Sequence, residues 1–267
     1  MRSLTTKALV LTAVVTSLAC LSMTALAQTY AQPRKLAIDA KVRQAFPSYF
    51  GRKQTYPQMD AEGLFPIGWS KDGKFAYYTE PVDEACGCYF AYLAIQDMRT
   101  DKVIWEFKYD QSDNGDDAKG NMKGPANIAQ LWKKNQKMFS QKLAENGIVA
   151  GTSTILAKSF TIGGKSYTAK SVNKMGPNKD EGYDRVNYYT VSLSSPKLGS
   201  KQLFRSEDHT KDDYWFMLDA GLIGAIKSPY ENRVAVIAIE VMRGYEGPPH
   251  TGQIHLVGAD LTSGFKK

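Results

Sequence analysis

Runs of aromatic and β-branched residues predict β-strands over most of the chain. Residues 74–78, 89–95 and 103–109 have the composition that favours strands. In the last of these runs the odd positions, from Val103 to Tyr109, are apolar or aromatic and fall on one face of the strand. Residues 160–162 and 165–169, joined by Gly163-Gly164, predict a hairpin, and residues 186–193 and 201–205 predict another.

The longest β-branched run, residues 233–241, predicts the centre of the fold. Its apolar character is nearly continuous, whereas a strand with one solvated face would alternate. We therefore expect a central strand that is covered on both faces. A closing strand is predicted over residues 254–257.

One amphipathic helix is predicted at about residues 125–146. Pro125 stands at its start and Asn146-Gly147 at its end, which is typical helix punctuation. Apolar residues recur at helical spacing, and four lysines lie mostly off that stripe. The stripe is Ile128, Leu131, Met138 and Leu143, joined by Trp132 and Phe139. We expect it to dock onto the sheet. A shorter helix is predicted before Pro47.

Two segments, residues 67–77 and 223–236, are related to each other. Each consists of a strand, a tight turn, a basic residue and a second strand, with the turns at Asp72-Gly73 and Glu231-Asn232. The string from Trp69 to Lys74 resembles the blade motif of periplasmic β-propellers of the Tol-associated kind. A propeller needs at least four blades, so this resemblance implies paired strands at each position only. The whole pattern predicts an α+β fold with predominantly antiparallel β-sheet, one prominent helix and these two segments.

The first 27 residues have the pattern of an export signal. Arg2 and Lys7 precede an apolar run at residues 8–19, and Ala25-Leu26-Ala27 follows as a small-x-small exit. We predict cleavage after Ala27, an N-terminal extension at residues 28–64 and a β-rich domain at 65–267 in the periplasm or outside the cell. A lipoprotein attached through Cys20 is an alternative. A retained anchor is disfavoured, because the apolar core is shorter than a membrane span.

The net charge indicates the properties of the surface and says little about function. It is +7 for the whole chain, and removal of Arg2 and Lys7 with the signal lowers it by two to +5. The lysines are spread along the sequence with acids between them, which predicts a solvated cationic surface able to adhere to an acidic envelope polymer. Nucleic acid is not expected as a partner, because no nucleic-acid-binding motif is present.

Two cysteines, Cys86 and Cys88, would remain after cleavage. Gly87 between them lets the backbone bend, and an oxidising compartment permits a disulfide, so we predict a local bridge. Free or metal-binding thiols and a redox couple are the alternatives.

Other candidate chemistry is sparse, and no catalytic residue is predicted. The string Gly68-Trp69-Ser70-Lys71-Asp72 lacks the final glycine of a hydrolase elbow, which leaves Ser70 as a turn residue. His209, His250 and His255 are not paired at zinc-ligand spacing. The loop that starts at Asp110 fits a calcium loop in part, with Asn121 where a glutamate is wanted, so calcium is only a minor alternative to no cofactor.

Residues 243–250, Arg-Gly-Tyr-Glu-Gly-Pro-Pro-His, form the most unusual loop. They predict either a stiff connection between two strands or a recognition surface.

Residues 65–77, 131–135 and 243–249 together resemble bacterial predicted secreted proteins of unknown function. The resemblance implies a shared secreted fold and transfers no residue role. We expect an exported, soluble, non-enzymatic binding or envelope-associated protein with an unknown ligand. The alternatives are an extracytoplasmic hydrolase, whose site would be assembled from distant residues, and a minor redox role for Cys86 and Cys88. A pocket with convergent carboxylates or histidine would favour the hydrolase.

Protein recovered from the periplasm or medium should begin at Gln28, because cleavage is predicted after Ala27. Intact-mass spectrometry measures this directly. A mature species beginning at a lipidated Cys20 would contradict the prediction.

Overall fold

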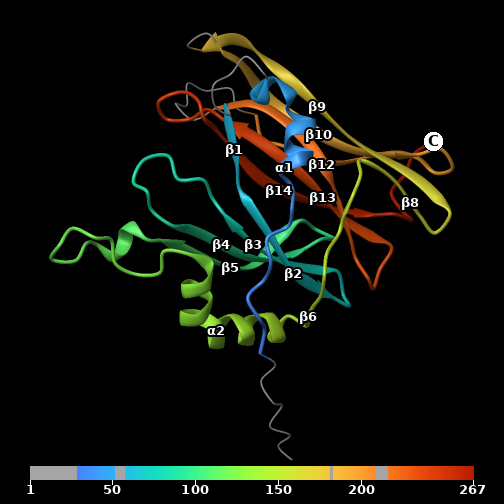
Figure 1. Cartoon of the computed structure of the whole chain (residues 1–267). Coiled ribbons are helices and arrows are strands. Elements are labelled where there is room, and N and C mark those ends of the chain that lie inside the picture. Colours follow the sequence, from blue (N-terminus) through green and yellow to red (C-terminus); the bar gives the residue numbers. More distant parts are fainter. Residues whose placement is uncertain (1–28, 52–57, 181–182, 209–215) are drawn as a thin grey trace, which may run out of the picture.

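The computed structural model describes residues 29–51, 58–180, 183–208 and 216–267. The predicted signal, Cys20 and His209 lie outside these residues. These described residues form three β-sheets and one long helix, which stack as four layers (Figure 1).

The helix-backed sheet is an antiparallel meander with a short fifth strand, in the order β5-β4-β3-β2-β6. Its strands are β2 (Gly63–Ser70), β3 (Lys74–Glu80), β4 (Phe90–Asp97), β5 (Lys102–Asp110) and β6 (Ile148–Ala150). Helix α2 (Ile128–Glu145) packs on its outer face.

The central sheet has the order β1-β14-β13-β12-β7, and only its β1–β14 pair is parallel. Its strands are β1 (Met59–Ala61), β7 (Ile155–Leu156), β12 (Met217–Lys227), β13 (Arg233–Met242) and β14 (His250–Asp260). The outer sheet is antiparallel in the order β11-β10-β9-β8. Its strands are β8 (Ser159–Ile162), β9 (Lys165–Asp180), β10 (Tyr183–Ser195) and β11 (Gly199–Arg205).

Strand β13 lies in the middle of the stack, as its sequence predicts. Ala235, Ile237 and Ile239 face the helix-backed sheet, and the alternate residues Val234 and Val236 face the outer sheet. All five are fully buried. A strand that is apolar on both faces is stable only between two layers, so the central sheet holds the fold together.

The two related segments form equivalent hairpins, β2–β3 and β12–β13, and the predicted α+β class is confirmed. Each hairpin has a register shift next to a glycine, at Gly68 and at Gly224. A Cβ atom would lie 2.0 Å from the Val149 carbonyl oxygen at Gly68 and 2.2 Å from the Leu156 carbonyl oxygen at Gly224. Glycine is therefore required at both positions, because the neighbouring strand, β6 or β7, approaches the backbone closely.

The structural likeness between the two units extends to a third strand, which their sequences did not indicate. After β4, the Met98 amide donates to the Gly73 carbonyl oxygen at 3.0 Å. After β14, the Leu261 amide donates to the Asn232 carbonyl oxygen at 2.8 Å. In both units the turn after the third strand thus closes onto the turn of the hairpin.

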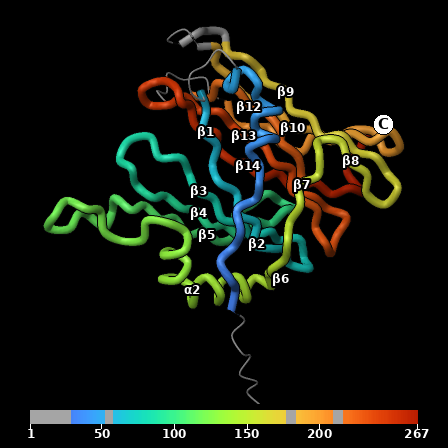
Figure 2. The backbone as a smooth tube through the Cα atoms, viewed as in Figure 1, coloured from blue at the N-terminus to red at the C-terminus, as the bar shows by residue number. Residues whose placement is uncertain are grey.

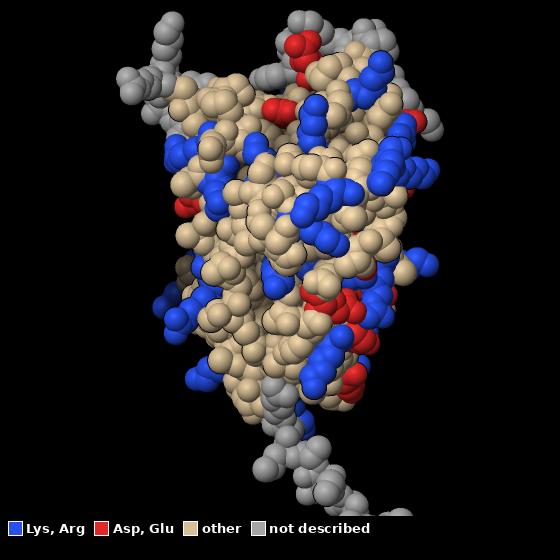
Figure 3. Space-filling view, turned by 90° about the vertical axis from the view of Figure 1, so that its right-hand side faces the viewer, with Lys and Arg blue, Asp and Glu red and all other residues tan. Residues whose placement is uncertain are grey.

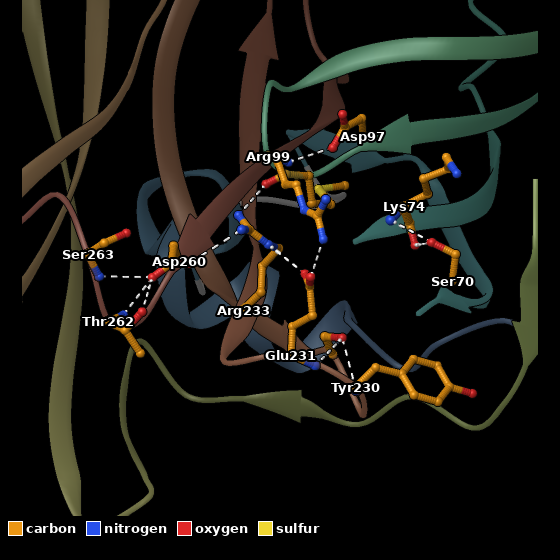
Figure 4. A network of polar contacts seen from close by, with 12 residues as sticks. Ser70, Lys74, Asp97, Arg99, Tyr230, Glu231, Arg233, Asp260, Thr262 and Ser263 are labelled. Carbon is orange, nitrogen blue, oxygen red and sulfur yellow. Dashed lines mark hydrogen bonds and ion pairs between the residues drawn. The ribbon is translucent and has the colours of Figure 1, made fainter. Parts of the chain in front are cut away.

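An ionic network joins these turns at one end of the two sheets (Figure 4). Glu231 pairs with Arg99, and its other carboxylate oxygen accepts from Arg233 Nε at 3.0 Å. Arg233 also lies 3.4 Å from Asp260 and donates to the Met98 carbonyl oxygen at 2.8 Å. Met98 and Arg99 follow β4, whereas Glu231 precedes β13, Arg233 begins it and Asp260 ends β14. The network therefore links the helix-backed sheet to the central sheet.

Helix α2 begins three residues later than predicted. Asn127 is its N-cap and accepts from the Gln130 amide at 3.0 Å, while Gln130 Oε1 accepts from the Ala126 amide at 2.9 Å. Leu131, Trp132, Phe139, Ser140 and Leu143 are buried. Met138 is not, with 36% of its surface exposed, so its assignment to the buried stripe was wrong. It lies about 100° around the helix from Phe139, and Phe139 occupies the sheet-facing position.

The N-terminal segment packs into the same core. Tyr30 lies beneath α2, where its amide donates to Ser140 Oγ at 3.1 Å and its carbonyl oxygen accepts from Trp132 Nε1 at 3.1 Å. Figure 2 shows this N-terminal segment, in blue, running from beside α2 to α1 (Asp39–Ala45). This short helix precedes Pro47, as predicted, and a 3-10 turn (Pro47–Phe50) follows it.

Charged side chains are scattered over the outside of this stack. On the face shown in Figure 3, Lys and Arg are dispersed over the surface, whereas many of the Asp and Glu side chains gather in one cluster. The dispersal agrees with the solvated cationic surface that the sequence predicts.

Leu131→Ala should destabilise the fold by about 2–5 kcal/mol, because the side chain is fully buried between α2 and the sheet. Lys134→Ala on the exposed side of α2 should change the free energy of unfolding by less than about 0.5 kcal/mol. Urea denaturation of the two single variants measures both. Equal, negligible effects would show that the stripe is not a packing surface.

Candidate functional site

The edge of β14 is paired with a strand only at one end. β1 covers residues 250–252, and beyond it side chains take the place of a neighbouring strand. Glu62 Oε2 accepts from the Ile254 amide at 3.0 Å, Gln96 Nε2 donates to the Leu256 carbonyl oxygen at 3.0 Å, and Asp101 Oδ1 accepts from the Gly258 amide at 2.7 Å. Three side chains thus satisfy backbone groups that would otherwise be buried without hydrogen bonds.

The same edge forms one wall of a cleft. Gln96 and Asp101 join β14 to the helix-backed sheet, and near Glu62 a pocket of about 530 Å³, the inter-sheet cleft, opens along this edge. Glu240 and His255 line it from the face of the central sheet that meets the outer sheet, where they contact Tyr189 and Phe204. Its lining comes from both sheets and the adjoining loops: Glu62, Tyr77, Thr79, Pro81, Phe90, Ala91, Tyr92, Lys108, Tyr109, Asp110, Asp113, Glu240, Gln253, Ile254 and His255.

Two glutamates of the cleft interact electrostatically. Burial, opposed by the hydrogen bond from the Ile254 amide and assisted by the nearby charge of Glu240, raises the pKa of Glu62 from 4.5 to about 7. Glu240 is held from the other side of the central sheet, where it accepts from the Tyr189 hydroxyl at 2.6 Å. The cleft therefore contains a carboxyl group that changes charge near neutral pH.

Aromatic rings and a histidine complete the walls. The rings of Tyr77 and Tyr92 meet edge to face, with centroids 6.3 Å apart. The Tyr92 hydroxyl donates to Glu106 at 2.9 Å, and Lys108 pairs with the same carboxylate at 3.1 Å. His255 lies against Phe204 with ring centroids 4.4 Å apart, and burial lowers its pKa although the charge of Glu240 opposes this.

The cleft is acidic although the chain is basic. Four acidic residues, Glu62, Asp110, Asp113 and Glu240, are among its lining residues, and Lys108 is the one Lys or Arg among those that the structure describes. The chain as a whole has a net charge of +7. The field inside the cleft therefore favours positive charge.

The sulfur atoms of Cys86 and Cys88 lie at disulfide-bonding distance, and their Cα atoms are 5.1 Å apart. They occupy the loop between β3 and β4, where Gly87 has a φ of +66°. Cys88 is buried and Cys86 exposed, and neither lines the inter-sheet cleft. This placement fits a local structural bridge.

Carboxylates in the predicted calcium loop accept hydrogen bonds from their own segment. Asp110 Oδ1 accepts from the Ser112 amide at 2.8 Å, and Asp117 Oδ1 from the Asn121 amide at 2.9 Å. Within residues 29–51, 58–180, 183–208 and 216–267, no group of three or more His, Cys, Asp or Glu side chains is arranged to hold a metal ion. Calcium binding stays an untested minor alternative.

The loop at residues 243–250 is a compact connection between β13 and β14. Arg243 and His250 are buried, and the Gly244 amide donates to His250 Nδ1 at 3.2 Å. A Cβ atom at Gly244 would lie 2.3 Å from the Gly247 carbonyl oxygen, so the tight loop requires glycine there. Tyr245 is exposed, and its amide donates to Glu84 at 2.9 Å. The geometry favours the stiff-connection alternative.

A second cavity, of about 470 Å³, lies beside His250, Tyr49 and Asp219. The inter-sheet cleft is the larger of these two cavities and its lining comes from two sheets, so it is the candidate site.

The sequence analysis did not single out Glu62 or Glu240. The sequence could have indicated Glu240, because it is the one charged residue between Arg233 and Met242 in an otherwise apolar strand. Nothing in the sequence indicates Glu62, because its partner Ile254 is 192 residues away. His255 was noted only as a strand residue, and the structure places it in the cleft.

Comparison of the chain with protein-family models, curated proteins and solved structures found no match. The resemblance to bacterial secreted proteins stays a prediction. In the part of the chain that the structure describes, no helix has both the length and the apolar character to cross a membrane.

Glu62→Gln should reduce the loss of stability between pH 4.5 and 7. The pKa of Glu62 is about 7 in the folded protein against an ordinary 4.5, so the folded state binds more protons in this window and stability falls as the pH rises. The full shift corresponds to about 3 kcal/mol. Glutamine keeps an acceptor for the Ile254 amide and has no proton to lose. Urea denaturation from pH 4 to 8 measures the difference.

Asp101→Asn is the matched control, because Asp101 also accepts from the β14 edge and lies outside the cleft. Burial raises the pKa of Asp101 from 3.8 to about 6, so this variant should alter the window from pH 3.8 to 6. A Glu62→Gln profile identical to that of the wild type would contradict the assignment.

Proposed function

We propose that this chain is an exported binding protein and that the inter-sheet cleft binds a small organic cation. The observation that carries the proposal is that four acidic residues and several aromatic residues line one cleft of a basic chain. Carboxylates pair with ammonium groups, and aromatic faces attract cations. The volume of the cleft, about 530 Å³, falls within the range of small-molecule sites.

The contacts of Glu62 and Glu240 support binding over catalysis. Each carboxylate is held by a group of the fold, the Ile254 amide or the Tyr189 hydroxyl, which fixes its position before a ligand arrives. Such preorganisation strengthens recognition of a charged group.

Spermidine is a suitable probe, measured by isothermal titration calorimetry at pH 8. Glu62→Gln should weaken binding about tenfold, the effect of losing one charge-assisted contact. Lys108→Ala should tighten it, because this exposed lysine repels a cation at the cleft. Asp101→Asn should leave the affinity unchanged.

The wild-type affinity for spermidine should rise as the pH increases through 7, because Glu62 becomes charged there. The neutral 1,8-octanediol should not bind. Absence of spermidine binding, or equal affinities in the wild type and in Glu62→Gln, would contradict the proposal.

The second candidate is a hydrolase, because a pocket lined by carboxyl residues and a histidine favours one, and Glu62, Glu240 and His255 line this cleft. A carboxyl group that holds its proton near neutral pH beside a second carboxyl suits general acid–base chemistry. Release of p-nitrophenol from p-nitrophenyl glycosides that disappears in Glu62→Gln would favour this candidate.

A further inference from the structure

The outer sheet has one face against the central sheet and one face open. The inner face supplies Tyr167, Ala169, Tyr189, Val191 and Leu193 to the core. The alternate side chains on β9 and β10 point the other way, because successive residues of a strand face opposite sides. Three pairs of these residues, Thr168 with Ser194, Lys170 with Ser192 and Lys174 with Tyr188, lie directly opposite each other.

One half of this open face is a plane of hydroxyl groups. Ser159 pairs with Thr168 across β8 and β9, with their hydroxyl oxygens 3.1 Å apart, and Thr161 pairs with Ser166 at 3.2 Å. Ser194 on β10 extends the row from Thr168. All five side chains are exposed, so the surface offers donors and acceptors in a flat array.

The other half is cationic. Lys170 and Lys174 are exposed and lie four residues apart on β9, about 13 Å along the strand. Arg205 lies two strands away on β11, opposite Thr190, and this places it about 12 Å from either lysine. Its guanidinium group lies 3.8 Å from the centre of the Tyr188 ring and pairs with Asp208.

We propose that the open face of the outer sheet binds a linear acidic polysaccharide. The spaced cations match carboxylates that recur along a polymer, and the hydroxyl plane beside them matches the hydroxyl groups of sugar rings. None of the described lining residues of the inter-sheet cleft lies on β8, β9, β10 or β11, so the face is separate from the cleft and the proposal does not depend on the proposed function.

The chemistry of the face favours a polysaccharide over two other polyanions. Single-stranded nucleic acid needs exposed rings for stacking, and the Tyr188 ring is covered by Arg205. A membrane surface needs apolar side chains that insert, and among the outward positions named here Val172 is the exposed aliphatic one.

The test compares two double variants with the same change of charge. Lys170→Glu/Lys174→Glu reverses the lysines of the open face, and Lys133→Glu/Lys134→Glu reverses two exposed lysines of α2 at the opposite end of the stack. Binding to immobilised polygalacturonate is measured by biolayer interferometry at low salt, with dextran as the neutral polymer. The thermal midpoints verify that both variants fold.

We expect the Lys170/Lys174 variant to bind polygalacturonate at least about tenfold more weakly, and the α2 variant to stay within about twofold of the wild type. Affinity should fall as salt rises, because the contacts are exposed. Ser194→Ala/Thr168→Val, which keeps every charge, should weaken binding to polygalacturonate and leave binding to polyphosphate unchanged.

Equal losses in the two charge-reversal variants would overturn the proposal, because they would reflect net charge alone. Absence of binding by the folded wild type would overturn it too. Tighter binding to single-stranded DNA through the same lysines would make the face a nucleic-acid surface in place of a polysaccharide site.

Discussion

The rest of the structure depends on how the backbone amides and carbonyls at the edge of β14 find hydrogen-bond partners. A strand in the middle layer cannot leave its amides and carbonyls buried without partners, and β1 is too short to pair with the whole edge. Glu62, Gln96 and Asp101 supply the missing hydrogen bonds from the helix-backed sheet and its approaches. Because these side chains reach the edge from the neighbouring layer, they also fix the position of one sheet over the other.

This arrangement gives the two sheets a closed end and an open end. At the closed end Arg233 links Glu231, Asp260 and the backbone of Met98, so the turns of the two related units are held together. At the open end, near Glu62, the inter-sheet cleft opens along the β14 edge. Glu62 has two roles, since its carboxyl group accepts a hydrogen bond from the β14 edge and its side chain lines the cleft. Its pKa is raised because the side chain must be buried to reach that edge.

Local patterns predicted the elements, and long-range pairing escaped them. The apolar run at residues 233–241 and the helical spacing around Leu131 depend on nearest neighbours, and both predictions hold. Met138 was misplaced because spacing alone does not fix which side of a helix meets a sheet. Glu62 and Glu240 were not predicted as part of a site, because they meet only after distant segments pack together, as the 192-residue separation of Glu62 and its partner Ile254 shows.

The parallel pair of β1 and β14 has a consequence for how the chain folds. The first strand of the chain pairs with the last, so the middle layer closes a very long loop, and contacts of this kind form slowly. The meander β2–β5 lies early in the chain and pairs largely within itself, whereas β1 waits for residues near the C-terminus. The layer that supports the other two sheets is thus completed only after residues 250–252 are available to pair with β1.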